Sequence, residues 1–144
     1  MSGVRVRVAD WDSDREAIRY IRERVFIEEQ SVPREIEWDG LDHECVHVLA
    51  EYANRDAVGT GRLHKSGKIG RMAVLRPWRG RQVGSAILTC LLEAAKSQGI
   101  AEVYLHAQTS ALAFYAAFGF VEEGDEFREA GIPHRLMKRR VELD

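Results

Sequence analysis

The segment from Arg71 to Gly84 holds the residues whose types and order most directly indicate binding chemistry. An apolar stretch leads there into a basic turn that contains Gly80, and an amphipathic pattern follows. Glycine lets the backbone approach a ligand closely, and the unpaired N–H groups that open a helix bind an anion with help from the helix dipole. Positive charge is added by Arg76, Arg79 and Arg81. The segment therefore predicts a phosphate-binding turn between a strand and a helix.

Composition limits what else the chain binds. Its 144 residues, 45% of them hydrophobic, predict one domain over residues 1–144, and the net charge of -2 gives no general reason to expect a nucleic-acid partner. No apolar run reaches membrane-spanning length, and the first residues lack the apolar core of a signal peptide. Cys45 and Cys90 are too few and too far apart for a disulfide framework. We expect a cytoplasmic enzyme with a small partner and no membrane partner.

The elements that position the basic turn follow from periodicity and punctuation. Alternating valines predict a strand over residues 4–8, and Asp10 to Ser13 offers caps for a helix that ends near Gln30. Residues 31–42 contain Pro33 and Gly40 and lack a period, which indicates an irregular segment with one further helical turn. Strands are predicted over residues 45–52, 57–64 and 68–75, and a polar turn at 54–56 joins the first two.

Helices and strands also alternate in the second half of the chain. Apolar residues at helical spacing predict a helix from Gln82 to Gln98, which Gly99 ends. We expect a strand over residues 103–107, a short helix over 109–118, a short strand at 120–121 and a last strand over 135–141. This order predicts an α/β (α+β) fold, with a mixed central sheet of about six to seven strands flanked by helices.

Two motifs resemble those of a known enzyme superfamily. The strand, Arg-Gly-rich turn and helix from Arg71 to Leu92, followed by ALAFYAAFGF over residues 111–120, resemble the GNAT superfamily of N-acetyltransferases. The segments 25–33, 39–40 and 131–134 are similar, more narrowly, to small members of the ElaA and YjcF type. The resemblance covers nearly the whole chain. It implies the GNAT fold, with acetyl-coenzyme A as cosubstrate.

The resemblance assigns the cofactor mainly to backbone groups. Residues 72–74 would pair with the pantetheine arm, and residues 79–85 would hold the pyrophosphate. This chain departs from the family pattern at Gln82, where the family has glycine, and at Gln108, where it has asparagine. We expect Gln82 to keep an ordinary negative φ and pyrophosphate binding to survive. The cofactor-binding candidates are Met72, Ala73, Val74, Arg79, Gly80, Arg81, Gln82, Val83, Gly84, Ser85, Gln108, Ala111 and Phe114.

Acetyl transfer to an amine needs a proton donor for the departing thiolate and a group that takes a proton from the amine. Tyr115 suits the donor, because a phenol with an ordinary pKa of about 10 stays protonated at neutral pH, and the resemblance implies the same role. His134 is the first choice as base, since histidine accepts protons near neutrality and the predicted strand 68–75 has no carboxylate. A core aromatic residue and a turn-capping histidine are the structural alternatives.

Other side chains are candidates for holding the acceptor: Glu28, Glu29, Arg71 and His106. The two glutamates would attract a cationic substrate, and they and the histidine are reserve bases. The arginine offers a guanidinium for a substrate carboxylate or phosphate, as do Arg22 and Arg24 on the first predicted helix. Solvated surface charges are the alternative for these arginines.

Two further patterns give little support to other chemistry. His43, Cys45 and His47 alternate as on one strand face, but the two histidines would lie about 13 Å apart along a strand, which argues against a metal site. Residues 59–66 lack the glycine that a nucleotide-binding loop needs before its lysine. They fit a strand in which Gly59 and Gly61 relieve crowding.

The sequence thus leads to a principal hypothesis and two alternatives. The principal one is transfer of an acetyl group from acetyl-coenzyme A directly to a primary amine of a small molecule, with a protein or peptide amine left open. A non-catalytic acyl-coenzyme A sensor or interaction module is the first alternative, favoured by Gln82 and Gln108. A nucleic-acid role would rest on the basic residues at 76–81, where Trp78 is the one interleaved aromatic residue. We also expect the last strand to be an exposed edge that could pair across a homodimer.

Overall fold

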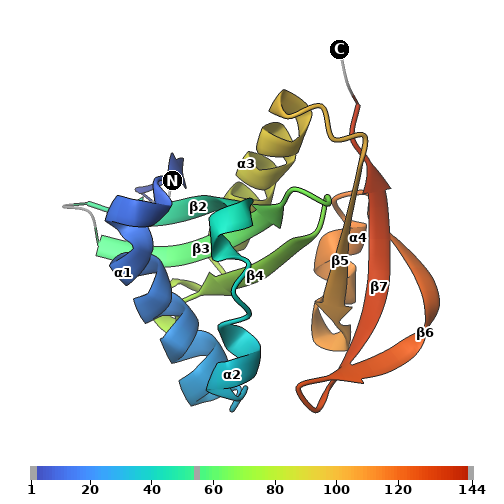
Figure 1. The fold of residues 1–144 in the computed structure, drawn as a ribbon, viewed down its shortest axis with the longest axis horizontal. Helices are drawn as coiled ribbons and strands as arrows, with labels where there is room; N and C mark the ends of the chain where they lie inside the picture. The colour runs from blue at the N-terminus through green and yellow to red at the C-terminus, as the bar shows by residue number, and fades with distance from the viewer. Residues whose placement is uncertain (1–2, 54–55, 143–144) are drawn as a thin grey trace.

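The chain folds around two antiparallel sheets that lie side by side (Figure 1). The computed structural model describes residues 3–53 and 56–142. Within them, one sheet has the strand order β1-β2-β3-β4 and the other has the order β5-β7-β6. A parallel bridge between Lys68 and Tyr104 joins the two, and the Tyr104 N–H donates to the Gly67 carbonyl at 3.0 Å. The predicted mixed α/β architecture is confirmed. The predicted central sheet is divided into two sheets, which this bridge joins.

The first sheet comes from the N-terminal half of the chain. Its strands are β1 (Val4–Ala9), β2 (Cys45–Tyr52), β3 (Asp56–His64) and β4 (Ile69–Val74). Each neighbouring pair is antiparallel. These strands lie where alternation and apolar runs predicted them. Part of the predicted turn at 54–56 falls on residues 54–55, outside the described residues.

Helices cover both faces of the first sheet. On one face, α1 (Trp11–Arg22) begins at Asp10, whose side chain accepts from the Asp12 N–H, and it continues as a π-helical segment, η1 (Glu23–Glu29). The irregular segment that follows contains the predicted helical turn, α2 (Arg34–Glu37), and the 3-10 turn η2 (Asp42–Glu44). Among the described residues, no helix is both long and apolar enough to cross a bilayer.

The other face is covered by α3 (Val83–Ser97), whose buried residues join both sheets into one core cluster. Gly61 of β3 makes this close packing achievable. A Cβ placed there would lie 2.9 Å from Ile87 Cγ2 and 2.9 Å from Leu91 Cδ1, far inside normal contact distance. The expectation that glycine relieves crowding on this strand is thus confirmed. Gly99 ends the helix with a φ of 71°, as predicted.

The second sheet contains the main departures from expectation. It consists of β5 (Glu102–Gln108), β6 (Val121–Glu129) and β7 (Ile132–Arg140), with η4 (Thr109–Ala111) and α4 (Leu112–Ala116) before β6. The predicted two-residue strand at 120–121 is wrong in extent. Most of β6 is exposed at the sheet edge, so it carries glutamates in place of an apolar alternation.

The position of the last strand corrects a second expectation. β7 lies between β5 and β6 and pairs antiparallel with both, so both of its edges are occupied. A homodimer formed through the last strand is therefore excluded. The free edge of this sheet belongs to β6, where the register shifts between Glu123 and Phe127 and Gly124 has a φ of 78°.

Candidate functional site

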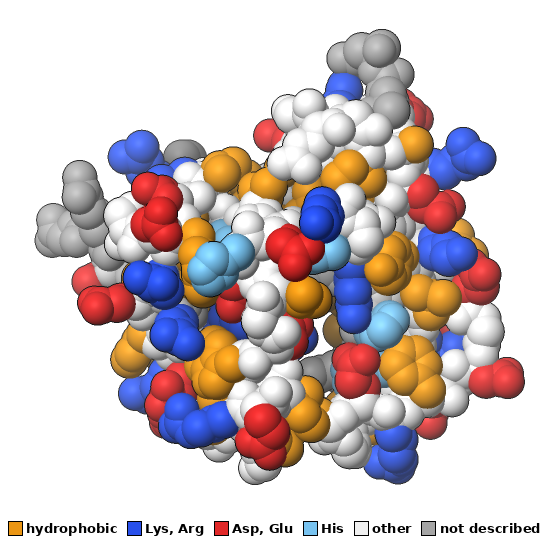
Figure 2. All heavy atoms as spheres, viewed as in Figure 1, with side chains coloured by type: hydrophobic (Ala, Val, Ile, Leu, Met, Phe, Trp, Pro, Cys, Tyr) orange, Lys and Arg blue, Asp and Glu red, His pale blue; other side chains and the backbone are white. Residues whose placement is uncertain are grey.

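The main pocket lies where the two sheets diverge. It has a volume of about 400 Å³ and is lined by residues of β4, β5, α4, the segment around α2 and the β6–β7 hairpin. Figure 2 shows this face, on which basic, histidine and acidic side chains gather around a hollow between α2 and the hairpin. Both catalytic candidates, Tyr115 and His134, line the pocket, and so do Arg71 and His106.

Tyr115 projects from α4 toward β4. Its hydroxyl donates to the Met72 sulfur at 3.6 Å, and its ring meets Phe114 and Phe120 edge-on at 5.0 and 5.9 Å. Burial raises the pKa of Tyr115 to about 12, because the phenolate would lose its hydration. The hydroxyl therefore holds its proton throughout the neutral range, inside a pocket wall made of apolar groups.

His134 is held on β7 with one ring nitrogen committed. Its Nδ1 lies 2.6 Å from the Ile132 carbonyl oxygen, and its ring stacks on Phe127 with centroids 5.9 Å apart. A carbonyl only accepts hydrogen bonds, so Nδ1 carries the proton of the neutral ring and Nε2 keeps a lone pair. The side chain is 8% exposed. His134 thus makes the backbone contact expected of a structural histidine and still has a free lone pair at Nε2.

A carboxylate that the sequence analysis missed lies between two histidines of this pocket. Glu129 Oε1 is 2.9 Å from His106 Nδ1, and Glu129 Oε2 is 3.9 Å from His134 Nε2. Burial is the largest single influence on Glu129 and would raise its pKa, but the hydrogen bond from His106 and the charges of nearby basic groups together lower the pKa. Glu129 is the last residue of β6. Because the predicted strand covers only residues 120–121, the sequence does not place Glu129 on a strand beside the pocket.

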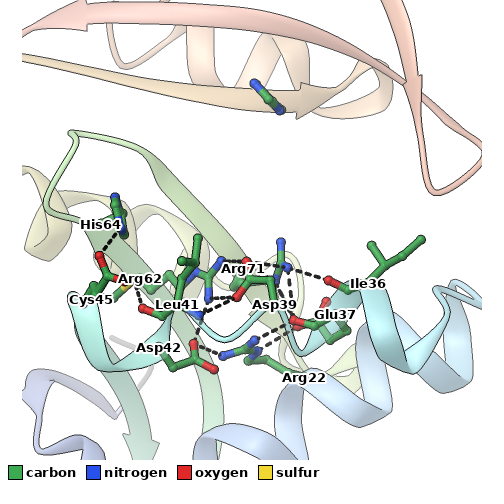
Figure 3. A network of polar contacts seen from close by, with 12 residues as sticks. Arg22, Ile36, Glu37, Asp39, Leu41, Asp42, Cys45, Arg62, His64 and Arg71 are labelled. Atoms are coloured by element: carbon green, nitrogen blue, oxygen red, sulfur yellow. Dashed lines mark hydrogen bonds and ion pairs between the residues drawn. The ribbon is translucent and has the colours of Figure 1, made fainter.

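A buried network of ion pairs forms one side of the pocket (Figure 3). Arg22 is fully buried and donates to Glu37 Oε2 and Asp42 Oδ1, each at 2.7 Å. Arg62 also donates to Asp42, at 2.8 Å. Arg22 is therefore occupied within the protein and does not reach a substrate, which corrects its interpretation as a substrate-binding arginine.

Arg71 connects this network to the pocket surface. Its guanidinium donates to the Glu37 carbonyl at 3.0 Å and to Asp39 Oδ2 at 3.2 Å, so it anchors the segment around α2 to β4. Burial is the largest single influence on Asp39 and would raise its pKa, but the hydrogen bonds from Arg62 and the Leu41 N–H, together with the charges of Arg62 and Arg71, lower that pKa to about 2. Arg71 itself has a φ of 50°, a left-handed conformation that costs free energy outside glycine.

The basic turn forms a second pocket of about 390 Å³ at the start of α3. The residues that line it are Val74, Trp78, Arg79, Gly80, Gln82, Val83, Gly84, Ser85 and Phe114. Gln82 precedes the helix with a φ of 65°, so the expected negative φ is wrong. The position has the left-handed backbone that glycine adopts without strain. The Gln82 side chain makes no capping hydrogen bond, which leaves first-turn N–H groups of α3 without that partner.

The arginines of the turn are engaged within the protein. Arg79 donates to Glu29 Oε1 at 2.8 Å and to the Val74 carbonyl at 2.9 Å, and Arg76 reaches Glu29 Oε2 at 3.3 Å. Arg81 lies over the Trp78 ring, 5.0 Å from its centroid. The guanidinium of Arg79 is thus not aimed at a phosphate, and a ligand in this pocket would meet backbone groups first.

These contacts also correct the two glutamate candidates. Glu29 is bound to arginines, and the hydrogen bond from Arg79 lowers its pKa. Glu28 forms an exposed ion pair with Arg24 at 3.6 Å. Neither glutamate lines the main pocket. Their carboxylates stabilise the turn and the helix surface, so they are not available to bind an acceptor there.

The remaining cofactor candidates are divided between the two pockets. Met72, Gln108 and Ala111 line the main pocket, where Gln108 Nε2 donates to Gln30 Oε1 at 2.9 Å. Ala73 is buried against α1, so only its backbone is available to a ligand on this strand. Sequence reasoning missed the pocket residues of the irregular segment because nothing in that segment has a period.

Comparisons with known proteins agree with this geometry. The acetyltransferase (GNAT) domain model matches residues 11–141. Uncharacterized N-acetyltransferase YjcF of Bacillus subtilis is 40% identical over 124 residues, which cover 83% of this chain and 88% of YjcF. Protein ElaA of Escherichia coli is 34% identical over 133 residues, covering 87% of this chain and 86% of ElaA.

Solved structures show the same fold. The crystal structure of Escherichia coli ElaA superimposes with a TM-score of 0.81 at 30% identity, over 94% of this chain and 99% of that one. A GNAT family acetyltransferase from Elizabethkingia anophelis, solved with acetyl-CoA bound, has a TM-score of 0.74 at 15% identity, over 97% of this chain and 99% of that one. At that identity the likeness concerns the fold alone.

Proposed function

Because the chain belongs to the GNAT acetyltransferase family, we propose that it transfers an acetyl group from acetyl-coenzyme A directly to a primary amine of a small molecule. The observation that carries the proposal is the pocket between the diverging sheets, which both Tyr115 and His134 line. The proposal takes residues 1–144 as one acetyltransferase domain that acts in the cytoplasm. Arg71 and His106 remain candidates for contacting the acceptor, whereas Glu28 and Glu29 are left out.

The residues present fit an acyl-coenzyme A ligand. The start of α3 lacks a side-chain cap, so its first N–H groups suit a diphosphate. In the described part of the chain, no ladder pair joins residues 72–74 of β4 to β5, which leaves backbone groups for a pantetheine arm. Acetyl-coenzyme A, when bound, supplies the activated acetyl thioester. The acetyl-CoA in the Elizabethkingia anophelis neighbour supports this choice of ligand.

Two side chains carry the proton transfers in this proposal. His134 Nε2 takes a proton from the acceptor amine, so that the N–H bond of the amine breaks and a bond to Nε2 forms. The Tyr115 hydroxyl would give its proton to the thiolate that leaves when the acetyl carbon exchanges its bond to sulfur for a bond to the amine nitrogen. Water would then return a proton to the Tyr115 phenolate and accept the one held by His134. Burial raises the pKa of this phenol to about 12, so Tyr115 keeps its proton throughout the neutral range. The proton is therefore still present when the thiolate develops beside it.

The experiment is a panel of primary amines screened for release of free thiol from acetyl-coenzyme A. Tyr115→Phe is expected to lower kcat by about 100-fold with little change in the KM for acetyl-coenzyme A, because it removes a proton donor and keeps the ring. Tyr20→Phe is the matched control, since Tyr20 is 51% exposed on α1, and it is expected to leave both constants unchanged. Equal activity of the two variants would contradict the assigned role of Tyr115.

A non-catalytic acyl-coenzyme A sensor is the second candidate function. It is favoured by the left-handed Gln82 and by Gln108, whose amide donates to Gln30. Calorimetric binding of coenzyme A without thiol release across the amine panel would support the sensor. Thiol release that depends on Tyr115 would support the enzyme.

A further inference from the structure

The end of β6 brings one carboxylate between two histidines at the mouth of the main pocket. Glu129 Oε1 lies 2.9 Å from His106 Nδ1 on β5, and Glu129 Oε2 lies 3.9 Å from His134 Nε2 on β7. We propose that Glu129, oriented by His106, is the positioning residue that stabilises His134 after it has taken the proton of the acceptor amine. This inference rests on the proposed function, because it concerns the base of that reaction.

The protonation of His134 defines what Glu129 can do. The Ile132 carbonyl accepts from Nδ1 at 2.6 Å, so the neutral ring offers its lone pair at Nε2. At 3.9 Å the Glu129 carboxylate is too far from Nε2 for a hydrogen bond, and Nε2 stays open to an amine. Proton uptake creates a cation at that distance from the carboxylate. Opposite charges so close, beside partly buried walls, stabilise the protonated ring.

The contact with His106 explains why the carboxylate stays in place. A glutamate side chain has three rotatable bonds, and an unheld one that is 43% exposed would sample many positions. The hydrogen bond from His106 Nδ1 takes up Oε1 and leaves Oε2 on the side of His134. Phe127 contacts both histidine rings, at 5.0 Å and 5.9 Å between centroids. Three strands of the second sheet therefore fix the arrangement.

The charged and titratable groups that line the same pocket come from every element around it: Glu37, Asp39, Lys68, Arg71, His106 and Tyr115. Lysine and arginine do not titrate near neutrality, Asp39 has a pKa of about 2 and Tyr115 one of about 12. Burial raises the pKa of Glu37. A change in the kcat profile could therefore come from Glu37 or His106 as well as from His134, and the experiment must distinguish these sources. Direct observation of the His134 ring by NMR separates them.

The test compares Glu129→Gln with Glu126→Gln in the full chain. Glutamine keeps the shape of the side chain and an oxygen that accepts from His106, but it removes the charge. We expect kcat to fall about tenfold, the acceptor KM to stay within about twofold, and the acid limb of the kcat profile to move to lower pH. Glu126 is an exposed residue of the same strand, and its variant is expected to match the unsubstituted protein.

The same variants are followed by NMR titration of the His134 ring, which needs no turnover. A lower midpoint in Glu129→Gln than in Glu126→Gln supports the inference. An unchanged midpoint with a raised acceptor KM would overturn it, because Glu129 would then bind the acceptor ammonium directly. If the chain acetylates no amine while the midpoint still falls, the proposed function fails and the coupling of Glu129 to His134 stands.

Discussion

At the scale of single residues, the site contains backbone conformations that its side chains do not favour. Arg71 and Gln82 both have a positive φ, of 50° and 65°. Arg71 lines the main pocket, and Gln82 lines the pocket at the start of α3. This conformation costs free energy in residues other than glycine, and such residues keep it only where the surrounding structure imposes it. Two of these residues thus lie within β4 and directly before α3, and Ser31 and Ala130 also have a positive φ.

Replacing Gln82 by glycine is expected to relieve part of this strain. Glycine adopts the φ of 65° freely, so Gln82→Gly is expected to raise the free energy of unfolding by up to about 1 kcal/mol. Gln98→Gly, at the other end of α3 where φ is -90°, is expected to lower it by about 0.5 to 1 kcal/mol. Urea denaturation measures both. A loss in both variants would show that the turn at residue 82 is not strained.

The ion pairs of Asp39 make a pH-dependent contribution to stability. Its pKa is lowered from 3.8 to about 2 in the folded chain. A depressed folded pKa stabilises above the unfolded pKa, so the contribution is complete above about pH 5 and is lost as the pH falls toward 2. A shift of nearly two units corresponds to at most about 2 kcal/mol, and solvent screening lowers this figure because Asp39 is an exposed residue.

Asp39→Asn is accordingly expected to be less stable than the unsubstituted protein at pH 7, by about 1 to 2 kcal/mol, and this difference in the free energy of unfolding is expected to narrow from pH 4 downward. Denaturant unfolding at a series of pH values measures it. Asp125→Asn, at an exposed position of β6, is the control and is expected to show no such convergence. A gap that is constant with pH would mean that the carboxylate charge does not contribute.

At the scale of elements, the packing of α3 on β3 depends on glycine at position 61. Gly61→Ala would place a methyl group 2.9 Å from two α3 side chains, so the helix must shift, and we expect a loss of about 1 to 3 kcal/mol. Gly70→Ala is the matched control, because a Cβ at Gly70 meets nothing within 4 Å. Thermal and urea unfolding compare the two. Similar losses in both would contradict the close packing of α3 on β3.

The elements differ in how well the sequence predicts them, and the reason is physical. The helix at Val83–Ser97 is amphipathic and half-buried, so its apolar period is written in the sequence. β6 is exposed along most of its length and is held by pairing with β7, which leaves no period to read. The sequence therefore predicts only the first residue of this strand, Val121, and not the remainder that contains Glu129.

The candidate site shows the same division. Tyr115 and His134 were found through motifs and residue chemistry, and both line the main pocket. The contact of Arg79 with Glu29 joins residues 50 positions apart, and the network of Arg22 joins α1 to the segment around α2. Such contacts are made by tertiary packing, so local sequence does not encode them.

At the scale of the whole molecule, the proposed ligand would contact both sheets and the start of α3. A ligand that binds only the folded chain stabilises it, by about 2.7 kcal/mol at a concentration 100 times its Kd. Coenzyme A is therefore expected to raise the melting temperature in a concentration-dependent way. Gly84→Asp is expected to abolish the rise, because the turn is filled and a like charge faces the diphosphate.

Glu126→Gln serves as the reference for that measurement, since Glu126 is exposed on β6 and lines neither pocket. Calorimetry with coenzyme A and acetyl-coenzyme A checks the melting data independently. Ligand-induced stabilisation of the Gly84→Asp protein equal to that of the reference would place the binding site elsewhere.

The central position of β7 also determines when the pocket can exist during synthesis. β5 and β6 each pair with β7 and not with each other, so neither has a partner in the second sheet until β7 has left the ribosome. His134 belongs to that strand. A nascent chain that stops short of β7 therefore exposes two unpaired strand edges and lacks His134, the proposed base, so completion of the sheet also completes the lining of the main pocket.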